Sequence, residues 1–350
     1  MAIRVGLVGF GLGGAVFHAP LIEATSGLSL DAIVTANPER VARATERYPS
    51  ARVLPDVDAL LASAGELDLV VVTTPNRSHV PIALRAIEAG LHVVMDKPMA
   101  PTAADARRLA DAAAERGIVL TVFQNRRLDG DFLTVRRLVE EGALGQVLRF
   151  ESRFERWHPA VEGGWRDLGD PEEGGGMLLD LGAHLVDQVI RLFGPPSHVY
   201  GEVHVRRPGA EVDDDAFVAL THDGGVRSHL WMGLVAGSLG PRFRVLGLEG
   251  AFEKHGLDPQ EEQLASGMLP RDPAYGVEPP ERWGALVRGS EREPVPTERG
   301  DYPRFYADLA AAIASGSPPP VDAREAVRTM EVLEAARRSS RTGAVVELGG

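Results

Sequence analysis

The sequence predicts an α/β protein with two domains. Short β-branched runs alternate with helical patterns over the first third of the chain, which is typical of βαβ units and a doubly wound parallel sheet. A glycine-rich turn follows the first run, as it does in the Rossmann fold. Later segments are strand-like and joined by short turns, which indicates an α/β domain with a large, mostly antiparallel open sheet. We therefore expect domains at 1–123 and 124–350.

The elements can be assigned in order. In the first domain we expect strands at 3–8, 30–35, 67–73, 92–95 and 118–123, and helices at 15–25, 38–48, 78–89 and 101–116. In the second domain we expect strands at 146–156, 197–206, 216–221, 226–232 and 242–246, and helices at 132–141, 182–193, 302–315 and 322–341. Proline, glycine and charge dominate 256–300, which predicts an irregular stretch.

Composition excludes several classes of protein. A chain of 350 residues that is 44% hydrophobic and 25% charged can bury two cores. It has no apolar run near the ~20 residues that cross a bilayer, and its first residues lack a signal-peptide pattern, so we expect a cytoplasmic protein. A net charge of -13 argues against a nucleic acid partner, because the protein as a whole would repel a polyanion. With no cysteine there is no disulfide or thiolate metal site, and we predict no metal.

Lysine is rare in this chain. Of 37 basic residues, only Lys97 and Lys254 are lysines. An ammonium group can lose its proton when partly buried, whereas a guanidinium cannot, so a retained lysine indicates chemistry that arginine does not perform. This applies to Lys97. Lys254 has no chemical pattern around it, and we expect it on a solvated surface.

A G-x-G-x-x-G pattern lies directly after the first predicted strand and before the first helix. It consists of Gly9, Phe10, Gly11, Leu12, Gly13 and Gly14. In this context glycines permit a tight turn and the close approach of a pyrophosphate to the helix N-terminus. The pattern favours dinucleotide binding over an ordinary glycine-rich turn.

The end of the second predicted strand favours NADP over NAD. An acid that would hold the ribose 2′-hydroxyl of NAD is expected there. The chain instead has Thr35, Ala36 and Asn37, with Arg40 nearby to accept a 2′-phosphate. A solvated helix position explains Arg40 equally well.

Further candidates follow the third and fourth strands, because ligands of open α/β folds bind at the carboxyl edge of the sheet. They are Thr73, Thr74, Pro75, Asn76, His79, Asp96 and Lys97. Turn formation and helix capping explain the residues at 73–79 as well. Pro98 restricts Lys97 to an extended conformation, and a cis bond would aim the lysine across the site.

Asp180 and His184 are four residues apart at the start of a predicted helix and so share one face. A carboxylate beside an imidazole fits a general base held by a partner. Half of a metal site, or a helix cap with a core histidine, are the alternatives. Three glycines at 174–176 indicate that the backbone passes close to another group.

The motifs GFGLGG, TTPNRSH, AGLHVVMDKPMA and DLGAHLVDQ, in this order, resemble the glucose-fructose oxidoreductase, inositol dehydrogenase and MocA family over nearly the whole chain. FHAPLI, QNRRLDGDFLTV and GGWRDLGD more narrowly resemble the bacterial branch that includes NADP-dependent scyllo-inositol dehydrogenases. The chain departs from the family in two places. Asp96 stands where the family usually has glutamate, and 256–300 matches no pattern.

The resemblance implies a Rossmann domain that binds NAD(P) and a C-terminal domain that binds a sugar, inositol or related polyol. By motif match, Lys97, Asp180 and His184 would be catalytic. Cofactor contacts would also come from Gln124, Asn125, Trp165 and Arg166. Substrate contacts would come from Lys97, Asn125, Arg156, Trp165, Asp180 and His184.

The implied reaction moves a hydride between the nicotinamide and a carbinol carbon, with His184 taking the hydroxyl proton and Lys97 hydrogen-bonding the alkoxide. A cofactor-assisted lyase or hydrolase and a non-catalytic NAD(P)- and sugar-binding regulator are the alternatives. The presence of all three residues favours the dehydrogenase. We also expect a homodimer or homotetramer through the C-terminal sheet, since few helices are available to cover it and an apolar face should remain.

Overall fold

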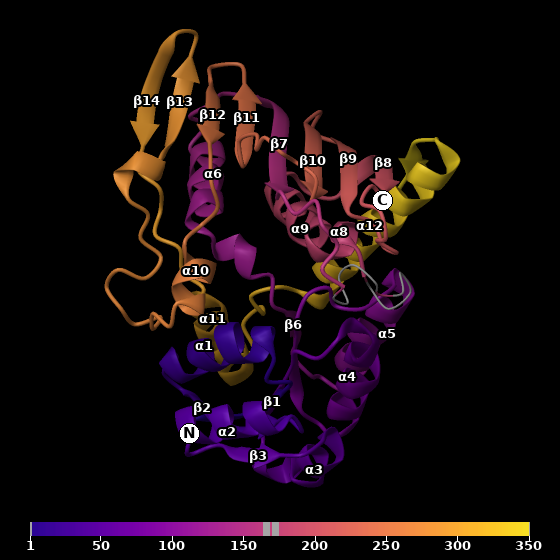
Figure 1. The fold of residues 1–350 in the computed structure, drawn as a ribbon, viewed down its shortest axis with the longest axis vertical. Coiled ribbons are helices and arrows are strands. Elements are labelled where there is room, and N and C mark those ends of the chain that lie inside the picture. Colours follow the sequence, from indigo (N-terminus) through magenta and orange to yellow (C-terminus); the bar gives the residue numbers. More distant parts are fainter. Residues whose placement is uncertain (1, 164–168, 170–174, 350) are drawn as a thin grey trace. The chain divides into compact units, whose positions relative to one another are not determined.

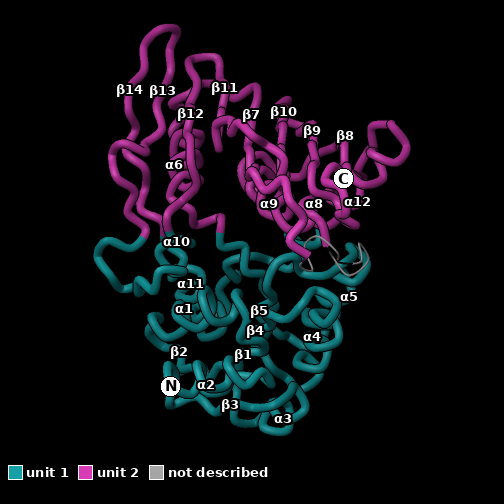
Figure 2. Tube along the Cα trace, viewed as in Figure 1, with its two compact units in different colours: residues 1–125, 260–275, 301–327 teal, residues 126–259, 276–300, 328–350 magenta. Residues whose placement is uncertain are grey.

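The computed structural model describes residues 2–163, 169 and 175–349, and the chain forms two compact units (Figure 2). Unit 1 contains residues 1–125, 260–275 and 301–327. Unit 2 contains residues 126–259, 276–300 and 328–350. Each unit is thus assembled from segments that are far apart in the sequence.

Unit 1 is built on a six-stranded parallel sheet with the order β3-β2-β1-β4-β5-β6 (Figure 1). This is the doubly wound order, in which the winding reverses between β1 and β4. The predicted Rossmann sheet is confirmed. Its strands are β1 (Ile3–Val8), β2 (Leu28–Val34), β3 (Arg52–Leu54), β4 (Leu69–Val72), β5 (His92–Met95) and β6 (Leu120–Val122).

The helices of unit 1 flank this sheet. A π-helical turn, Gly13–His18, continues directly into α1 (Ala19–Ala24). The others are α2 (Pro38–Arg47), α3 (Val57–Ala62), α4 (His79–Glu88), α5 (Ala103–Glu115), α10 (Gln260–Ala265) and α11 (Pro303–Ser315). The sequence does not predict β3, α3 or α10, because each is too short for a periodic pattern to stand out. Among the described residues, no helix combines the length and apolar character needed to cross a membrane.

Long-range contacts bind the late segments into unit 1. Thr121 on β6 donates its hydroxyl to the carbonyl oxygen of Val321 at 2.8 Å, a contact between residues 200 apart. The rings of Phe123 and Phe305 meet edge to face at 4.9 Å between centroids. The expected domain 1–123 contains the whole parallel sheet but not these late segments.

Unit 2 is built on a nine-stranded sheet with the order β14-β13-β12-β11-β7-β10-β9-β8-β15 (Figure 1). The pairing of β7 with β10 is parallel and the other pairings are antiparallel, as the sequence predicts for most of this sheet. The strands are β7 (Val147–Glu155), β8 (Pro196–His204), β9 (Asp215–His222), β10 (Arg227–Gly233), β11 (Phe243–Gly247), β12 (Ala251–Lys254), β13 (Gly284–Arg288), β14 (Glu291–Val295) and β15 (Val346–Glu347).

One face of this sheet carries the helices α6 (Gly130–Glu140), α8 (Met177–Asp180), α9 (Gly182–Phe193) and α12 (Ala323–Thr342). Phe150 on β7 lies 5.8 Å from Phe243 on β11 and 5.6 Å from Phe193 on α9, between ring centroids. A Cβ on Gly201 would lie 2.5 Å from the carbonyl oxygen of Ala336, so α12 packs directly on the backbone of β8. The alternating burial along β9 follows from this one-sided cover.

The opposite face of the sheet, here called the outer face, is mixed in character. Glu151 on β7 forms ion pairs with Arg149, Arg153 and Arg244 at 2.9, 3.1 and 3.3 Å. Aromatic side chains lie over β9 and β10, where Phe217 and Trp231 are 5.1 Å apart between ring centroids. The outer face therefore combines this aromatic group with the ion pairs around Glu151.

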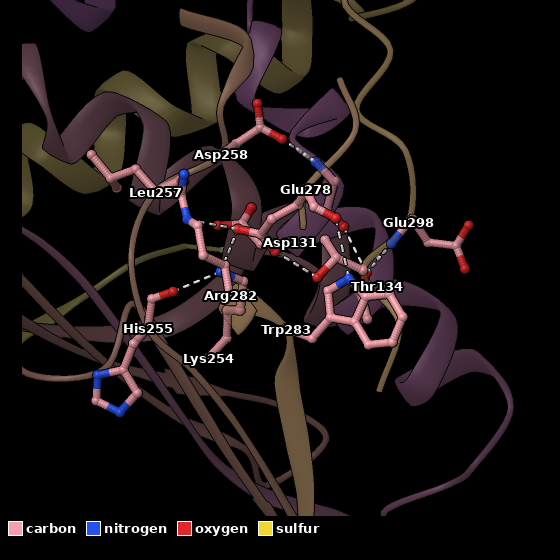
Figure 3. A network of polar contacts seen from close by, with 12 residues as sticks. Asp131, Thr134, Lys254, His255, Leu257, Asp258, Glu278, Arg282, Trp283 and Glu298 are labelled. Atoms are coloured by element: carbon pink, nitrogen blue, oxygen red, sulfur yellow. Dashed lines mark hydrogen bonds and ion pairs between the residues drawn. The ribbon is translucent and has the colours of Figure 1, made fainter. Parts of the chain in front are cut away.

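The stretch at 256–300 is more ordered than its composition predicts, because it contains α10, β13 and β14. Lys254 anchors part of it (Figure 3). The Lys254 ammonium donates to Glu278 Oε1 at 2.9 Å and to the carbonyl oxygen of His255 at 2.6 Å, and Thr297 donates its hydroxyl to Glu278 Oε2 at 2.7 Å. The expectation of a solvated Lys254 is wrong, since its side chain is fully buried. The partner Glu278 lies 24 residues away, beyond any local sequence pattern.

Replacing Lys254 with methionine should destabilise unit 2 strongly. The variant removes the closer cation of the buried Glu278 carboxylate and leaves Arg282 Nε at 3.5 Å from Oε1, and breaking a buried pair typically costs about 3–5 kcal/mol. Urea denaturation followed by tryptophan fluorescence measures the loss. Arg292→Met is the matched control, because its pair with Glu253 at 2.9 Å is largely exposed and should contribute less than about 1 kcal/mol. Equal stability of the two variants would contradict the expectation.

Candidate functional site

The turn after β1 needs its glycines for different steric reasons. Gly9 has a φ of +101°, and a Cβ there would lie 2.8 Å from the Thr73 hydroxyl oxygen. A Cβ on Gly14 would overlap the carbonyl oxygen of Gly9. A Cβ on Gly11 would meet only the guanidinium of Arg40, at 3.8 Å. The backbone of the turn is therefore packed against protein atoms at Gly9 and Gly14. At Gly11 it has free space beside it, through which a pyrophosphate could approach the backbone.

The local charge also fits an anion. The helix begins directly after the turn, so its unpaired N–H groups and the positive end of its dipole lie there. The Phe10 side chain is buried against Tyr48 and belongs to the core, whereas Leu12 is 58% exposed. Contact with a dinucleotide from these two positions would come from the backbone of Phe10 and the side chain of Leu12.

The end of β2 carries no acid, as the sequence indicates. Thr35 is buried and donates its backbone N–H to the carbonyl oxygen of Leu54 at 3.0 Å. Asn37 caps α2 by accepting from the backbone N–H of Arg40 at 3.1 Å. The Arg40 side chain is exposed and reaches back beside Gly11. A cation therefore lies close to the open position of the turn.

Residues after β4 hold the site's backbone in place. Thr73 donates its hydroxyl to the carbonyl oxygen of Gly9 at 2.9 Å. Ser78 donates its hydroxyl to the hydroxyl oxygen of Thr74, and Pro75 precedes a short 3-10 turn at Asn76–Ser78. These contacts hold the segment 73–78 at the carboxyl edge of the sheet.

His79 is a buried link between two backbone segments. Its Nε2 and Nδ1 atoms lie 2.8 and 3.1 Å from the carbonyl oxygens of Thr74 and Pro98. Burial lowers the pKa of His79, although Asp96 acts in the opposite direction. With both nitrogens facing the protein backbone, His79 would serve a cofactor by fixing the edge rather than by direct contact.

Asp96 and Lys97 lie directly after β5. The peptide bond between Lys97 and Pro98 is cis. Asp96 Oδ1 accepts from the backbone N–H of Lys97 at 2.8 Å, and Asp96 Oδ2 lies 2.8 Å from where a Cβ on Gly13 would be. Burial acts to raise the pKa of Asp96, but His18, Lys97 and His79 outweigh it, so the pKa is lowered. The carboxylate thus stays charged between the glycine-rich turn and the backbone of Lys97.

In unit 2, Asp180 and His184 belong to two consecutive helices rather than one. Asp180 is the last residue of α8, and α9 begins at Gly182 with His184 in its first turn. The backbone N–H of His184 bonds the carbonyl oxygen of Leu181 at 3.2 Å, a tighter spacing than in an α-helix. His184 is 5% exposed.

Buried polar contacts position α9. Arg127 donates two hydrogen bonds to the carboxylate of Asp187, both at 2.7 Å. Gln188 donates to the carbonyl oxygen of Arg126 at 2.8 Å and accepts from Arg242 at 3.0 Å. Because Asp187 and Gln188 are the neighbours of His184 along one helix, these bonds fix the helix that presents it. Their partners are distant in sequence, and sequence reasoning misses them.

The glycines before α8 approach a protein group. A Cβ on Gly176, whose φ is +95°, would overlap the carboxylate of Asp213. Asp213 Oδ2 accepts from the backbone N–H of Leu178 at 2.7 Å, and the Arg337 guanidinium donates to Asp213 Oδ1 at 3.4 Å. Burial raises the pKa of Asp213. The glycine at 176 is thus explained by a buried helix cap. Gly174 lies outside the described residues.

The remaining candidates are placed as follows. Gln124 and Asn125 are buried, at 3% and 6% exposure, just after β6. Arg156 borders a cavity of about 300 Å³ in unit 2, together with Arg153, Trp157 and Arg242. Trp165 and Arg166 lie outside the described residues. Within the described part of the chain, no cluster of side chains could hold a metal ion.

Comparisons with known proteins give one answer. Residues 3–124 match the model of the oxidoreductase family's NAD-binding Rossmann fold, and residues 136–348 match the model of the same family's C-terminal alpha/beta domain. The chain belongs to this oxidoreductase family. It is the family of glucose-fructose oxidoreductase, inositol dehydrogenase and MocA that the motifs resemble, and the protein is an NAD(P)-dependent oxidoreductase.

Individual relatives of the family cover almost the whole chain. The scyllo-inositol 2-dehydrogenase (NADP(+)) IolW of Bacillus subtilis is 36% identical over 345 residues, 97% of this chain and 94% of its own. The uncharacterized oxidoreductase YdgJ of Escherichia coli is 41% identical over 97% of this chain and 96% of its own. The solved structure of the oxidoreductase YvaA of Bacillus subtilis superposes with a TM-score of 0.93, at 34% identity and full coverage of both chains.

Gly11→Ala should weaken dinucleotide binding without unfolding unit 1. The added methyl has space in the protein but occupies the side from which a pyrophosphate approaches. We expect at least about a tenfold higher Kd in calorimetry, with an unchanged melting temperature. Gly14→Ala is the contrasting variant, because its methyl overlaps Gly9 and should lower the melting temperature as well. Unchanged affinity of Gly11→Ala would show that this face of the turn is not the binding surface.

Proposed function

We propose that this enzyme moves a hydride between a nicotinamide dinucleotide and a carbinol carbon of a sugar, inositol or related polyol. The observation that carries the proposal is the position of Lys97. It follows Asp96, whose carboxylate lies against Gly13 of the glycine-rich turn. In this proposal the glycine-rich turn binds the pyrophosphate, which would put the lysine next to the cofactor within unit 1.

The substrate class is supported by what relatives are known to oxidise. IolW acts on scyllo-inositol. A D-glucoside 3-dehydrogenase of Escherichia coli is 29% identical over 66% of this chain, and a D-apiose dehydrogenase of Paraburkholderia graminis is 27% identical over 92%. The shared feature of these substrates is a secondary or ring hydroxyl among several others. Such a molecule needs many hydrogen-bond donors and acceptors, which buried Asn125 and cavity-lining Arg156 would supply.

We assign the catalytic steps to Lys97, Asp180 and His184. A bound nicotinamide supplies the hydride acceptor or donor. His184 would take the proton of the reacting hydroxyl, and Asp180 would support the imidazolium that results. Lys97 would donate a hydrogen bond to the oxygen as its charge develops. The buried bonds of Arg127 with Asp187 support this assignment, because they fix the helix that carries His184.

The outer face of unit 2 is our proposed contact between copies in a homodimer or homotetramer. Packed aromatic side chains on β9 and β10 beside paired charges on β7 and β11 provide the apolar and charged groups for such a contact.

For the cofactor we propose a preference for NADP. Support comes from the absence of an acid at 35–37 and from the Arg40 guanidinium beside Gly11. Ala36→Asp should move the preference toward NAD, because a carboxylate repels the 2′-phosphate and accepts from the 2′-hydroxyl. Calorimetry with both dinucleotides gives the ratio of the two Kd values. Tighter NAD binding by the parent enzyme would overturn the preference.

The catalytic assignment predicts how variants lose rate. His184→Ala and Lys97→Ala should each lower kcat by at least about 100-fold, with dinucleotide Kd little changed. The double variant should lose far less than the product of the two. Lys97→Arg should not restore activity, because its wider, permanently charged group does not replace an ammonium.

Turnover of a panel of polyols and aldoses with NADP and NAD provides the measurement. If His184 is only a core residue, His184→Ala will lower the melting temperature and leave kcat within a few-fold of the parent. A parent enzyme that binds a dinucleotide but oxidises no member of the panel would contradict the proposed substrate class.

A further inference from the structure

Unit 1 contains a row of three polar side chains, of which two are fully buried and the third, Asp96, is partly exposed. His18 ends the π-helical turn, Tyr306 lies on α11, and Asp96 follows β5. The Tyr306 hydroxyl oxygen lies 2.6 Å from His18 Nδ1. His18 Nε2 lies 3.8 Å from Asp96 Oδ2, an ion-pair distance that is longer than a hydrogen bond. The three side chains therefore lead from the interior of the unit to the glycine-rich turn.

The environment fixes the ring of His18. Both His18 and Tyr306 are fully buried. The imidazole packs on the ring of Phe123 at 4.3 Å between centroids, and Phe305 packs against Tyr306 at 5.3 Å. His18 Nε2 makes no hydrogen bond within the described residues. The charged group that this nitrogen faces is the carboxylate of Asp96, at 3.8 Å.

The positions of the protons follow from the partners. A carboxylate can only accept, so the proton of a neutral His18 ring belongs on Nε2, facing Asp96. Nδ1 is then an acceptor, and Tyr306 donates its O–H to it. Burial, and secondarily the charge of Asp96, raises the pKa of Tyr306 well above its ordinary value, so the phenol keeps this proton. Tyr306 therefore selects the tautomer of His18.

At its other end, this row of three side chains reaches the glycine-rich turn. Asp96 Oδ2, the oxygen that faces His18, also lies against the backbone at Gly13. The other oxygen, Oδ1, accepts from the backbone N–H of Lys97. A displacement of this carboxylate would therefore disturb both the turn and the lysine. A buried imidazole of fixed tautomer on one side of it limits such displacement.

We propose that His18 is a positioning residue for dinucleotide binding: its Nε2–H, set by Tyr306, holds the Asp96 carboxylate between the glycine-rich turn and Lys97. The inference rests on the proposed function of that turn. His18 touches neither cofactor nor substrate in this scheme, and it acts only through Asp96.

Two substitutions at His18 separate this role from packing. The amide nitrogen of glutamine lies about where imidazole Nε2 does, whereas that of asparagine lies about where Nδ1 does. His18→Gln keeps a donor toward Asp96, and His18→Asn removes it. We expect NADP and NAD to bind His18→Gln within about threefold of the parent and His18→Asn at least about tenfold more weakly, because only glutamine keeps an N–H group that faces the carboxylate of Asp96. Calorimetry gives both Kd values.

A spectroscopic measurement keeps the test independent of activity and of the stability of these variants. In protein with ¹⁵N-labelled histidine, the signal that His18→Gln removes identifies His18. We expect it to report the Nε2–H tautomer in the parent and a mixture of tautomers in Tyr306→Phe, which keeps the ring and loses only the O–H. Tyr306→Phe should also weaken dinucleotide binding several-fold.

The outcomes separate the two ideas. If the parent binds a dinucleotide and His18→Gln and His18→Asn bind it equally well, or if His18 carries its proton on Nδ1, the inference is wrong and the proposed function stands. If the parent binds neither NADP nor NAD, the proposed function fails, and the inference fails with it.

Discussion

The close approach of the first helix to the end of β1 is the constraint on which the candidate site depends. Gly14 lies so near the carbonyl oxygen of Gly9 that no side chain fits between them. This contact brings the helix N-terminus to the carboxyl edge of the sheet, between β1 and β4, where the winding reverses. The neighbouring side chains then adapt to it, with Thr73 bonded to Gly9 and Asp96 seated against Gly13.

Unit 2 positions its candidate residues by a different physical means. Its helix α9 carries a buried polar face, and each polar group on that face needs a partner because an unpaired one would be costly. Arg127 and Arg242 supply those partners from other segments of the unit. The helix therefore has few alternative orientations, which suits a residue such as His184 that would have to meet a substrate hydroxyl.

The fold was largely predictable from the sequence because its signals are local. The alternation of apolar runs, the glycines at 9, 11 and 14 and the Lys97–Pro98 pair are each contained in a few residues. The missing elements were short or of unfavourable composition, such as β3 and the hairpin of β13 and β14. In the site, local motifs indicated Asp96 and Lys97, but not Tyr306, which contacts His18 across 288 residues. No periodicity or spacing reports a contact of that range.

Two local patterns have a partner far along the chain. Lys254, which was expected in solvent, pairs with Glu278. The backbone at Gly176, which was expected to pass close to another group, lies against the carboxylate of Asp213. The conformation of a segment is visible in its own sequence, whereas the identity of a buried partner is not.

The strand at the end of the large sheet limits how that sheet can associate. Strand β14 has the sequence EREPV, is exposed over most of its length, and pairs with β13 on one side. Pro294 has no N–H to donate to an added strand. The charged side chains that flank it would also lose contact with water if another strand paired with β14. At the other end, β15 is only two residues long. The sheet is therefore protected against growth along its hydrogen-bonding direction, so this protein can expose a broad face without the risk of edge-to-edge aggregation.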